Sequence, residues 1–310
     1  MPSDGHNNPG SGFGGPRYPG TFLLALREAF AKLNWEALTW KGSNVQCVDA
    51  EGISRQVGLD NLYRRLRSEP REKWSNLLAD LLGSVTPEAA TPPSDLSDVA
   101  DRLLVRLGPP FAYKGSGVDV WSYPIVEKHL SACLVIDYPT SMSYVTEKMI
   151  ADSTQDGAYW YQRALANLHA KSEAGCLVQV HDESGLLQSL VADAYDSSRG
   201  LLLDRLAPGH EENGFYVIVP GRDHLLAMPI TQGTLMMAPS LRGFAAKTFR
   251  ETPYPISPEL FWVHQGIWHH FVFESAGENL LVKPPAAFVD VMKRLQPTDD
   301  SQDDSDPLSN

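Results

Sequence analysis

Residues 191–230 read VADAYDSSRGLLLDRLAPGHEENGFYVIVPGRDHLLAMPI, and this stretch indicates how the chain folds. It opens with an acidic segment, continues with apolar residues at helical spacing, and ends with two apolar runs, 215–219 and 224–228. The two runs predict a β-hairpin closed by a turn at residues 220–223. Pro220 suits position i+1 of a type II turn, and Gly221 then takes position i+2, where φ must be positive.

The rest of the chain repeats this mixture of hairpins and helices. Strand-like runs come in neighbouring sets near residues 37–57, 118–138, 176–192 and 260–283, with turn residues between them. Apolar residues at helical spacing predict helices near 21–33, 59–66, 70–82, 95–107, 144–151, 159–170, 196–206, 236–250 and 286–295. Strands that arrive as hairpins predict an α+β fold with largely antiparallel sheets and packed helices, not a doubly wound parallel sheet.

Composition predicts two subdomains between disordered ends. Residues 1–20 contain six Gly and four Pro, which predicts a disordered arm, and residues 296–310 form an acidic tail that we also expect to be disordered. Residues 87–94 hold Pro87, Pro92 and Pro93 and are interpreted as a linker. It separates an N-terminal α+β subdomain, residues 21–86, from a C-terminal α+β domain, residues 95–295.

Bulk composition limits the classes of function. The chain is 43% hydrophobic and 21% charged, which is typical of a globular protein. Its net charge of −12 repels phosphate backbones and so disfavours nucleic-acid binding. The three cysteines include no close pair, residues 1–20 lack the features of a signal peptide, and no apolar run approaches the roughly 18 residues of a membrane span. We therefore expect a soluble cytoplasmic protein without a membrane partner.

Four collinear segments carry a resemblance to a known family. They are residues 58–63 (GLDNLY), 134–137 (LVID) with 144–146 (YVT), 164–168 (ALANL) and the block at 193–226. In order and spacing, over roughly residues 20–295, the chain resembles the YtpQ-like bacterial proteins of unknown function. The resemblance implies a soluble cytosolic α+β protein and brings no established activity. That family usually has Asn where this chain has Gly221, and both residues tolerate positive φ.

The acidic segment and the hairpin turn supply the candidate site residues, which are Asp193, Asp196, Arg199, Arg222 and Asp223. An Asp at position 196 suits a helix N-cap, and Arg199, one turn further on, can pair with either carboxylate. A guanidinium at a hairpin tip can bind a carboxylate or phosphate. The alternative interpretation is structural: a capped helix and an ion pair that fixes the turn.

Other reactive residues fit structural roles better. His264, His269 and His270 lack the spacing of a zinc site, and residues 181–183 (HDE) occupy a predicted turn. The thiols of Cys47, Cys133 and Cys176 all fall inside apolar strand runs, where buried inert thiols are expected. The sequence holds no GxSxG and no GxxxxGK[ST] motif, and Ser116 lacks a strand-to-helix setting.

Two functions are compatible with these patterns. The first is a non-catalytic binding or regulatory module that contacts a protein partner or a small ligand, with no cofactor and no metal. The second is a hydrolase of a small ester or phosphate that uses the Asp/Arg residues. The observation that separates them is whether the five candidate side chains converge on one concave pocket.

Overall fold

The computed structural model describes residues 18–41, 44–84, 93–110, 119–139, 141–172, 174–210, 212–276 and 279–296. The predicted arm, linker and tail lie almost wholly outside these ranges, as does Ser116. The chain divides into two compact units. The first comprises Met1–Pro92, Tyr138–Ser141 and Glu251–Pro253, and the second comprises Pro93–Asp137, Met142–Arg250 and Tyr254–Asn310.

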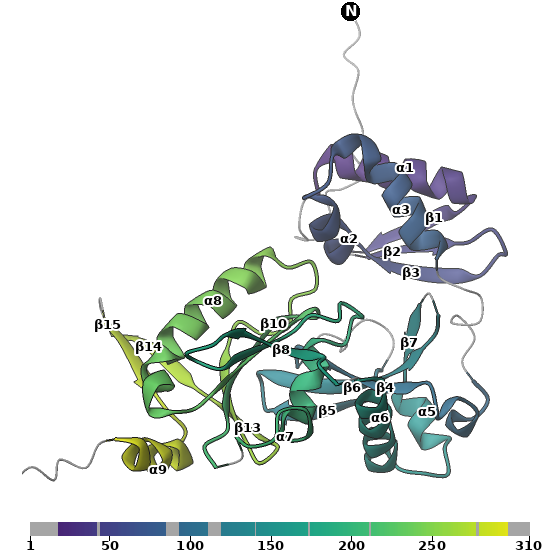
Figure 1. Ribbon diagram of the computed structural model, residues 1–310. Helices are drawn as coiled ribbons and strands as arrows, with labels where there is room; N and C mark the ends of the chain where they lie inside the picture. Colours follow the sequence, from purple (N-terminus) through teal and green to yellow (C-terminus); the bar gives the residue numbers. More distant parts are fainter. Residues whose placement is uncertain are drawn as a thin grey trace, which may run out of the picture. The chain divides into compact units, whose positions relative to one another are not determined.

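The first unit is a three-stranded sheet with helices (Figure 1). Its elements are α1 (Gly20–Leu33), β1 (Glu36–Lys41), β2 (Asn44–Val48), β3 (Ser54–Gly58), α2 (Leu59–Leu66), η1 (Arg71–Lys73) and α3 (Trp74–Gly83). The strands pair antiparallel in the order β1-β2-β3. Phe22 and Leu26 of α1 pack with Leu78 of α3 in one core, which also contains Val45 and Cys47 of β2.

The second unit begins with a short 3-10 helix and a four-stranded antiparallel sheet. Its elements are η2 (Leu96–Val99), β4 (Leu103–Gly108), β5 (Ser122–Val126), β6 (Leu130–Asp137), β7 (Met142–Tyr144), α5 (Glu147–Ala151) and α6 (Gly157–Lys171). β6 is central and pairs with β4, β5 and β7. α6 packs against β4, where the Asn167 amide donates hydrogen bonds to the carbonyl oxygens of Ala100 (2.7 Å) and Leu103 (2.8 Å).

The predicted helix at residues 95–107 is wrong. Asp95 does act as an N-cap, since its carboxylate accepts from Ser97 N at 2.8 Å, but the helix is only η2. The apolar run that follows is strand β4, in which every residue except Arg106 is buried. An apolar run that is covered on both faces has no alternation to mark it as a strand, so its sequence fits either a helix or a strand.

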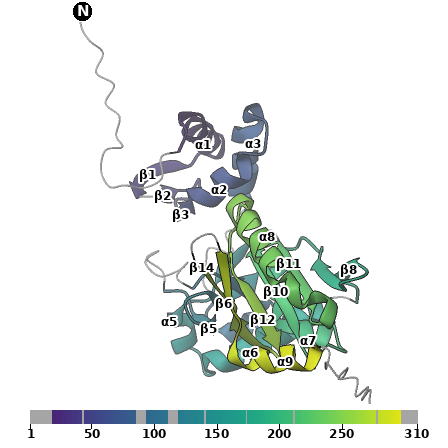
Figure 2. The same ribbon diagram turned by 90° about the vertical axis from the view of Figure 1, so that its left-hand side faces the viewer.

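The remaining elements build a six-stranded antiparallel sheet and its covering helices (Figure 2). They are β8 (Leu177–His181), β9 (Leu186–Ser189), η3 (Ser197–Leu202), α7 (Leu203–Leu206), β10 (Phe215–Gly221), β11 (His224–Pro229), η4 (Gln232–Met237), α8 (Ala238–Glu251), β12 (Leu260–His264), β13 (Ile267–His270), β14 (Val272–Ala276), β15 (Asn279–Lys283) and α9 (Ala286–Leu295). The strand order is β13-β12-β10-β11-β9-β8, and β14 pairs with β15 separately. The α+β fold class with antiparallel sheets is therefore confirmed.

The two faces of the six-stranded sheet are covered differently. On one face, Ile218 of β10 and Leu260 of β12 share a core with Leu241 of α8 and Phe288 of α9. On the other face lies η3, where a Cβ on Gly200 would stand 3.1 Å from the Trp268 ring and 3.2 Å from Leu225. The Ser198 hydroxyl accepts from Leu107 N of β4 at 3.0 Å. η3 is thus enclosed between the two sheets, and that position determines the burial of its side chains.

The hairpin at residues 215–229 is confirmed, but its predicted turn is wrong. β10 continues through Gly221, which pairs with His224, so Arg222 and Asp223 alone form the turn. Gly221 is not among the described glycines with positive φ. The strand is prolonged because the segment before β12 pairs with it: Ile256 N donates to Pro220 O (3.1 Å) and Arg222 N donates to Tyr254 O (2.9 Å).

No helix among the described residues is both long and apolar enough to cross a lipid bilayer.

Candidate functional site

The acidic segment forms a compact loop between β9 and η3. Ala192 and Ala194 both lie in the left-handed region, at φ 59° and 73°, a conformation that costs about 1–3 kcal/mol for a residue with a Cβ. Asp196 holds the loop closed. Its carboxylate is almost fully buried and accepts hydrogen bonds from the Ser189 hydroxyl, from Val191 N (3.0 Å) and from Ala192 N (2.9 Å).

The prediction that Asp196 caps the following helix is therefore wrong. Its backbone is already helical (φ −52°, ψ −51°), and its side chain accepts no hydrogen bond from η3. A capping side chain must point forward to the amides of the first turn, whereas this carboxylate points backward to the loop that precedes it. Asp suits both roles, because in each its carboxylate accepts hydrogen bonds from backbone N–H groups.

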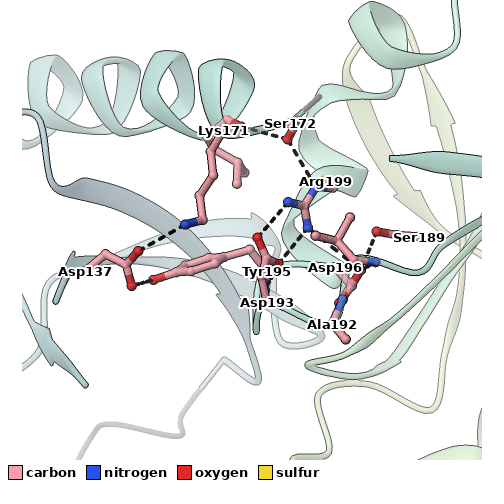
Figure 3. Close-up of polar contacts among 11 residues, drawn as sticks. Asp137, Lys171, Ser172, Ser189, Ala192, Asp193, Tyr195, Asp196 and Arg199 are labelled. Carbon is pink, nitrogen blue, oxygen red and sulfur yellow. Dashed lines mark hydrogen bonds and ion pairs between the residues drawn. The ribbon is translucent and has the colours of Figure 1, made fainter. Parts of the chain in front are cut away.

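Arg199 is completely buried and pairs with Asp193 (Figure 3). Two parallel hydrogen bonds of 2.8 Å join Nη1 and Nη2 to the Asp193 carboxylate, and Nε donates to the Ser172 hydroxyl at 3.2 Å. The Asp196 carboxylate lies 3.8 Å from Nη1. Burial by itself raises the pKa of Asp193, but the Arg199 guanidinium outweighs that effect and holds the pKa of Asp193 below its ordinary value.

A neighbouring group of side chains extends this network to β6. The Tyr195 hydroxyl donates to Asp137 at 2.8 Å, and Lys171 Nζ lies 3.4 Å from the same carboxylate (Figure 3). Burial, and then the Asp137 charge, raises the pKa of Tyr195, which keeps this hydroxyl a donor. The sequence prediction omitted Asp137, Lys171 and Ser172, which come from β6 and the end of α6. The only signal in the sequence was a lone Asp, Asp137, at the end of an apolar run that forms a buried strand.

Arg222 and Asp223 form a separate pair at the hairpin tip. Nε and Nη2 of Arg222 each donate to the Asp223 carboxylate at 2.8 Å, and the guanidinium lies over the Tyr254 ring, 3.8 Å from its centroid. A backbone hydrogen bond from Ser197 N to Arg222 O (3.1 Å) joins the turn to the start of η3. The structure thus groups Asp193, Asp196 and Arg199 around η3 and leaves the turn pair on its own.

The histidines near residues 264–270 are packed against rings and a carboxylate. The rings of His264 and His269 each stack on Trp262, with centroids 4.9 Å apart. His270 Nε2 lies 3.2 Å from Glu259, and its ring stacks on His129 at 3.8 Å. Among the described residues, no three His, Cys, Asp or Glu side chains are grouped so that they can hold a metal ion.

The thiols and the remaining turn residues have local roles. Cys47, Cys133 and Cys176 are buried thiols that are not joined in disulfide bonds, and burial raises the pKa of Cys47, which makes its thiolate harder to form. His181 is the last residue of β8, and its Nδ1 accepts from Ser184 N of the following turn at 3.3 Å and lies 3.0 Å from the Ser184 hydroxyl. This contact spans three residues and is typical of a side chain that stabilises its own turn.

A second candidate surface, absent from the sequence predictions, is the outer edge of β8. β8 lies at the margin of the six-stranded sheet, and in the described part of the chain its only strand neighbour is β9 (Figure 2). Val178 and Val180 are 42% and 44% exposed. The strand LVQVH contains no Asp, Glu, Lys, Arg or Pro, which are residues that usually protect such edges from pairing.

One face of β8 is continuous with the core of the sheet. Residues directly opposite one another in neighbouring antiparallel strands point to the same face. Val178 lies opposite Gln188, which lies opposite Leu226, which lies opposite Ile218 of the core. The Val178 side chain therefore points to the same face of the sheet as the core that α8 covers. At Val178 this face is no longer covered, and the side chain is exposed.

Neither a protein-family model, nor a curated protein, nor a solved structure matches this chain. The resemblance to the YtpQ-like family stays a prediction.

Proposed function

We propose that this chain is a non-catalytic binding module that holds its partner by strand addition at the outer edge of β8. The observation that carries the proposal is an exposed, uncharged edge strand with two half-exposed valines. An edge strand presents backbone N–H and C=O groups that an extended segment can pair with, and alternate side chains then supply specificity. A partner that pairs with β8 gains main-chain hydrogen bonds and covers Val178.

The predicted Asp/Arg cluster supports a structural role better than a hydrolytic one. A hydrolase built on this Asp/Arg cluster would need a guanidinium that faces the charge developing on its ester or phosphate substrate. Arg199 is enclosed between the two sheets and makes a bidentate pair with Asp193. Arg222 pairs with Asp223 and stacks on Tyr254. Both guanidinium groups are used within the protein, so we assign the cluster to the scaffold that fixes the loop before η3.

A photo-crosslinking experiment tests the proposal. We place p-benzoylphenylalanine at Gln179, an exposed position on β8, in the full chain expressed in cells, and irradiate. The expected result is a discrete adduct that is lost when Val178→Lys is added. The matched control carries the same probe at Met236, which is 84% exposed but lies in η4. No adduct from position 179, or the same adducts from both positions, refutes strand addition at β8.

A further inference from the structure

Two histidines meet where the four-stranded sheet contacts the six-stranded sheet. His129 lies in the turn between β5 and β6, and His270 is the last residue of β13. β5 and β13 are in contact (Figure 1), and the two imidazole rings stack with their centroids 3.8 Å apart and their planes 28° from parallel. The stacked rings therefore join the turn of one sheet to a strand of the other.

We propose that this histidine pair is an acid-sensitive switch. While the pair carries at most one proton it holds the β5–β6 turn against β13, and uptake of a second proton releases the turn. Two imidazolium rings at this separation repel each other, whereas a neutral ring stacks on a charged one without that repulsion. Histidine is the side chain whose ordinary pKa lies between pH 5 and 8, so mild acidification supplies the second proton. The switch is independent of strand addition at β8.

The charges around the pair favour one proton over two. Glu259, directly before β12, lies 3.2 Å from His270 Nε2, and the hydrogen bond between them holds the pKa of Glu259 below its ordinary value. An ionised carboxylate only accepts, so Nε2 is the donor. The same carboxylate accepts two hydrogen bonds from Arg242 of α8, at 3.1 and 3.0 Å. One negative charge is thus shared between His270 and a permanent cation, and a proton on His129 adds a further positive charge.

His129 is the ring that resists protonation while the two rings are stacked. Burial, and then the charge of His270, lowers the pKa of His129, and Lys128 of the same turn acts in the same direction. The charge of Glu259 opposes these effects but does not outweigh them. A released turn returns His129 to water and separates it from His270. The released state therefore binds the proton more readily than the stacked state, and acid favours release.

Both partners of the stack lie where backbone hydrogen bonds open most easily. The turn is held by a hydrogen bond from His129 N to Val126 O (3.0 Å), and β13 lies at the margin of the six-stranded sheet. β6, in contrast, pairs with strands on both sides. We therefore expect the turn and β13 to open together when the stack is lost, while the hydrogen bonds of β6 stay closed.

Hydrogen–deuterium exchange of the full chain between pH 7.5 and 5.8, followed by mass spectrometry, tests this inference. Exchange is read in peptides that cover residues 126–130 and β13. At each pH the rate is divided by that of His129→Gln, which cancels the pH dependence of exchange itself, and the ratio is set to one at pH 7.5. Uptake of one proton by a histidine with an ordinary pKa of about 6.5 gives a rise of up to about fivefold by pH 5.8. A ratio that stays at one overturns the switch.

Low concentrations of urea distinguish a local release from unfolding of the whole unit. Exchange is repeated at pH 5.8 in urea from 0 to 1 M. A local release exposes little surface, so exchange in the turn and β13 should not change with urea. Exchange in β6 requires extensive unfolding and should accelerate. If the turn and β13 accelerate as steeply as β6, the proton acts through general unfolding and the proposed switch is refuted.

Two further variants identify the groups that set the response. Glu259→Gln removes the negative charge that faces the pair, so the exchange ratio should rise more steeply on acidification than in the wild type. His169→Gln, which replaces an exposed histidine in the last turn of α6, should follow the wild type. A His169→Gln protein that loses the response, or a folded Glu259→Gln protein with a smaller rise, contradicts the assignment to this pair. Circular dichroism at pH 7.5 checks folding, and the wild type and His129→Gln decide the inference even if Glu259→Gln does not fold.

Discussion

Replacement of Asp196 by Ala, Ser and Asn distinguishes a closed loop from a capped helix. In the structure the carboxylate accepts hydrogen bonds from Ser189, Val191 and Ala192 and none from the helix that follows. A helix cap tolerates Ser or Asn in place of Asp, since all three are good N-cap residues. The loop requires an acceptor that reaches backward with two oxygens, which only a carboxylate supplies.

The expected loss of folding stability follows from the polar groups that each substitution leaves without a hydrogen-bond partner. In Asp196→Ala the buried Ser189 hydroxyl loses its acceptor, and each buried polar group left unpaired costs about 1–3 kcal/mol. The amides of Val191 and Ala192 lose acceptors too, but they lie nearer to solvent and add less. We expect Asp196→Ala to lower the free energy of unfolding by about 2–4 kcal/mol. The Ser side chain is too short to reach these donors, so Asp196→Ser should lose as much stability as Asp196→Ala, within about 1 kcal/mol. Asn keeps one acceptor oxygen, so Asp196→Asn should lose about half as much.

Urea unfolding at pH 7, followed by circular dichroism and tryptophan fluorescence, measures these differences as shifts in midpoint at a common m value. Asp95 is the matched control, because its carboxylate does cap a helix by accepting from Ser97 N. Asp95→Ala should lower the free energy of unfolding by about 1 kcal/mol, and Asp95→Ser by only a few tenths of that unit. If Asp196→Ser lies within about 0.5 kcal/mol of the wild type, as a cap requires, the assignment of this carboxylate to the loop is refuted.

Two further predictions concern backbone conformation and pH. Gly214 has φ +74° and a Cβ there would overlap the Val263 carbonyl oxygen, so Gly214→Ala should lose at least about 2 kcal/mol in urea unfolding. Gly243→Ala, in α8 with open space around the site, should instead gain up to about 1 kcal/mol, and equal effects of the two changes would contradict the strain argument. Burial, and then the charge of His270, lowers the pKa of His129, so the unfolded chain takes up this proton more readily than the folded one. Wild-type stability should therefore fall relative to His129→Gln as pH drops from 7.5 through 6.5 to the lowered folded-state pKa, and parallel pH profiles of the two proteins would exclude this contribution.

Local pattern was sufficient for much of the secondary structure. The apolar spacing in 159–170 predicted α6, observed at Gly157–Lys171, because the side chains that face a core repeat at the helical period. Alternation and turn residues predicted the strands of the first unit and the hairpin of β10 and β11. Antiparallel α+β architecture followed from these local signals, since strands joined by short turns must run antiparallel.

What the sequence left open depends on contacts between distant segments. β4 was mistaken for a helix because all of its residues except Arg106 are buried, which leaves no alternation of apolar and polar residues along the strand. The turn at Arg222 and Asp223 was displaced by pairing with the segment before β12, which begins more than thirty residues later. Proline and glycine in the sequence show where a turn can form. Where the strand pairing ends, however, depends on the neighbouring segment of the sheet.

The sequence alone determined that carboxylates and guanidinium groups gather near residues 193–223, because their chemistry is visible in the residue types. Only the tertiary structure decided which of these charged groups are buried. Arg199 is buried since η3 lies between two sheets and finds Ser172 and Asp193 there, and no local signal encodes that environment. Likewise, the residues of β8 do not show that it is an edge strand. The order of strands in a sheet is set by which apolar faces pack together across the whole unit, and that order alone leaves Val178 exposed.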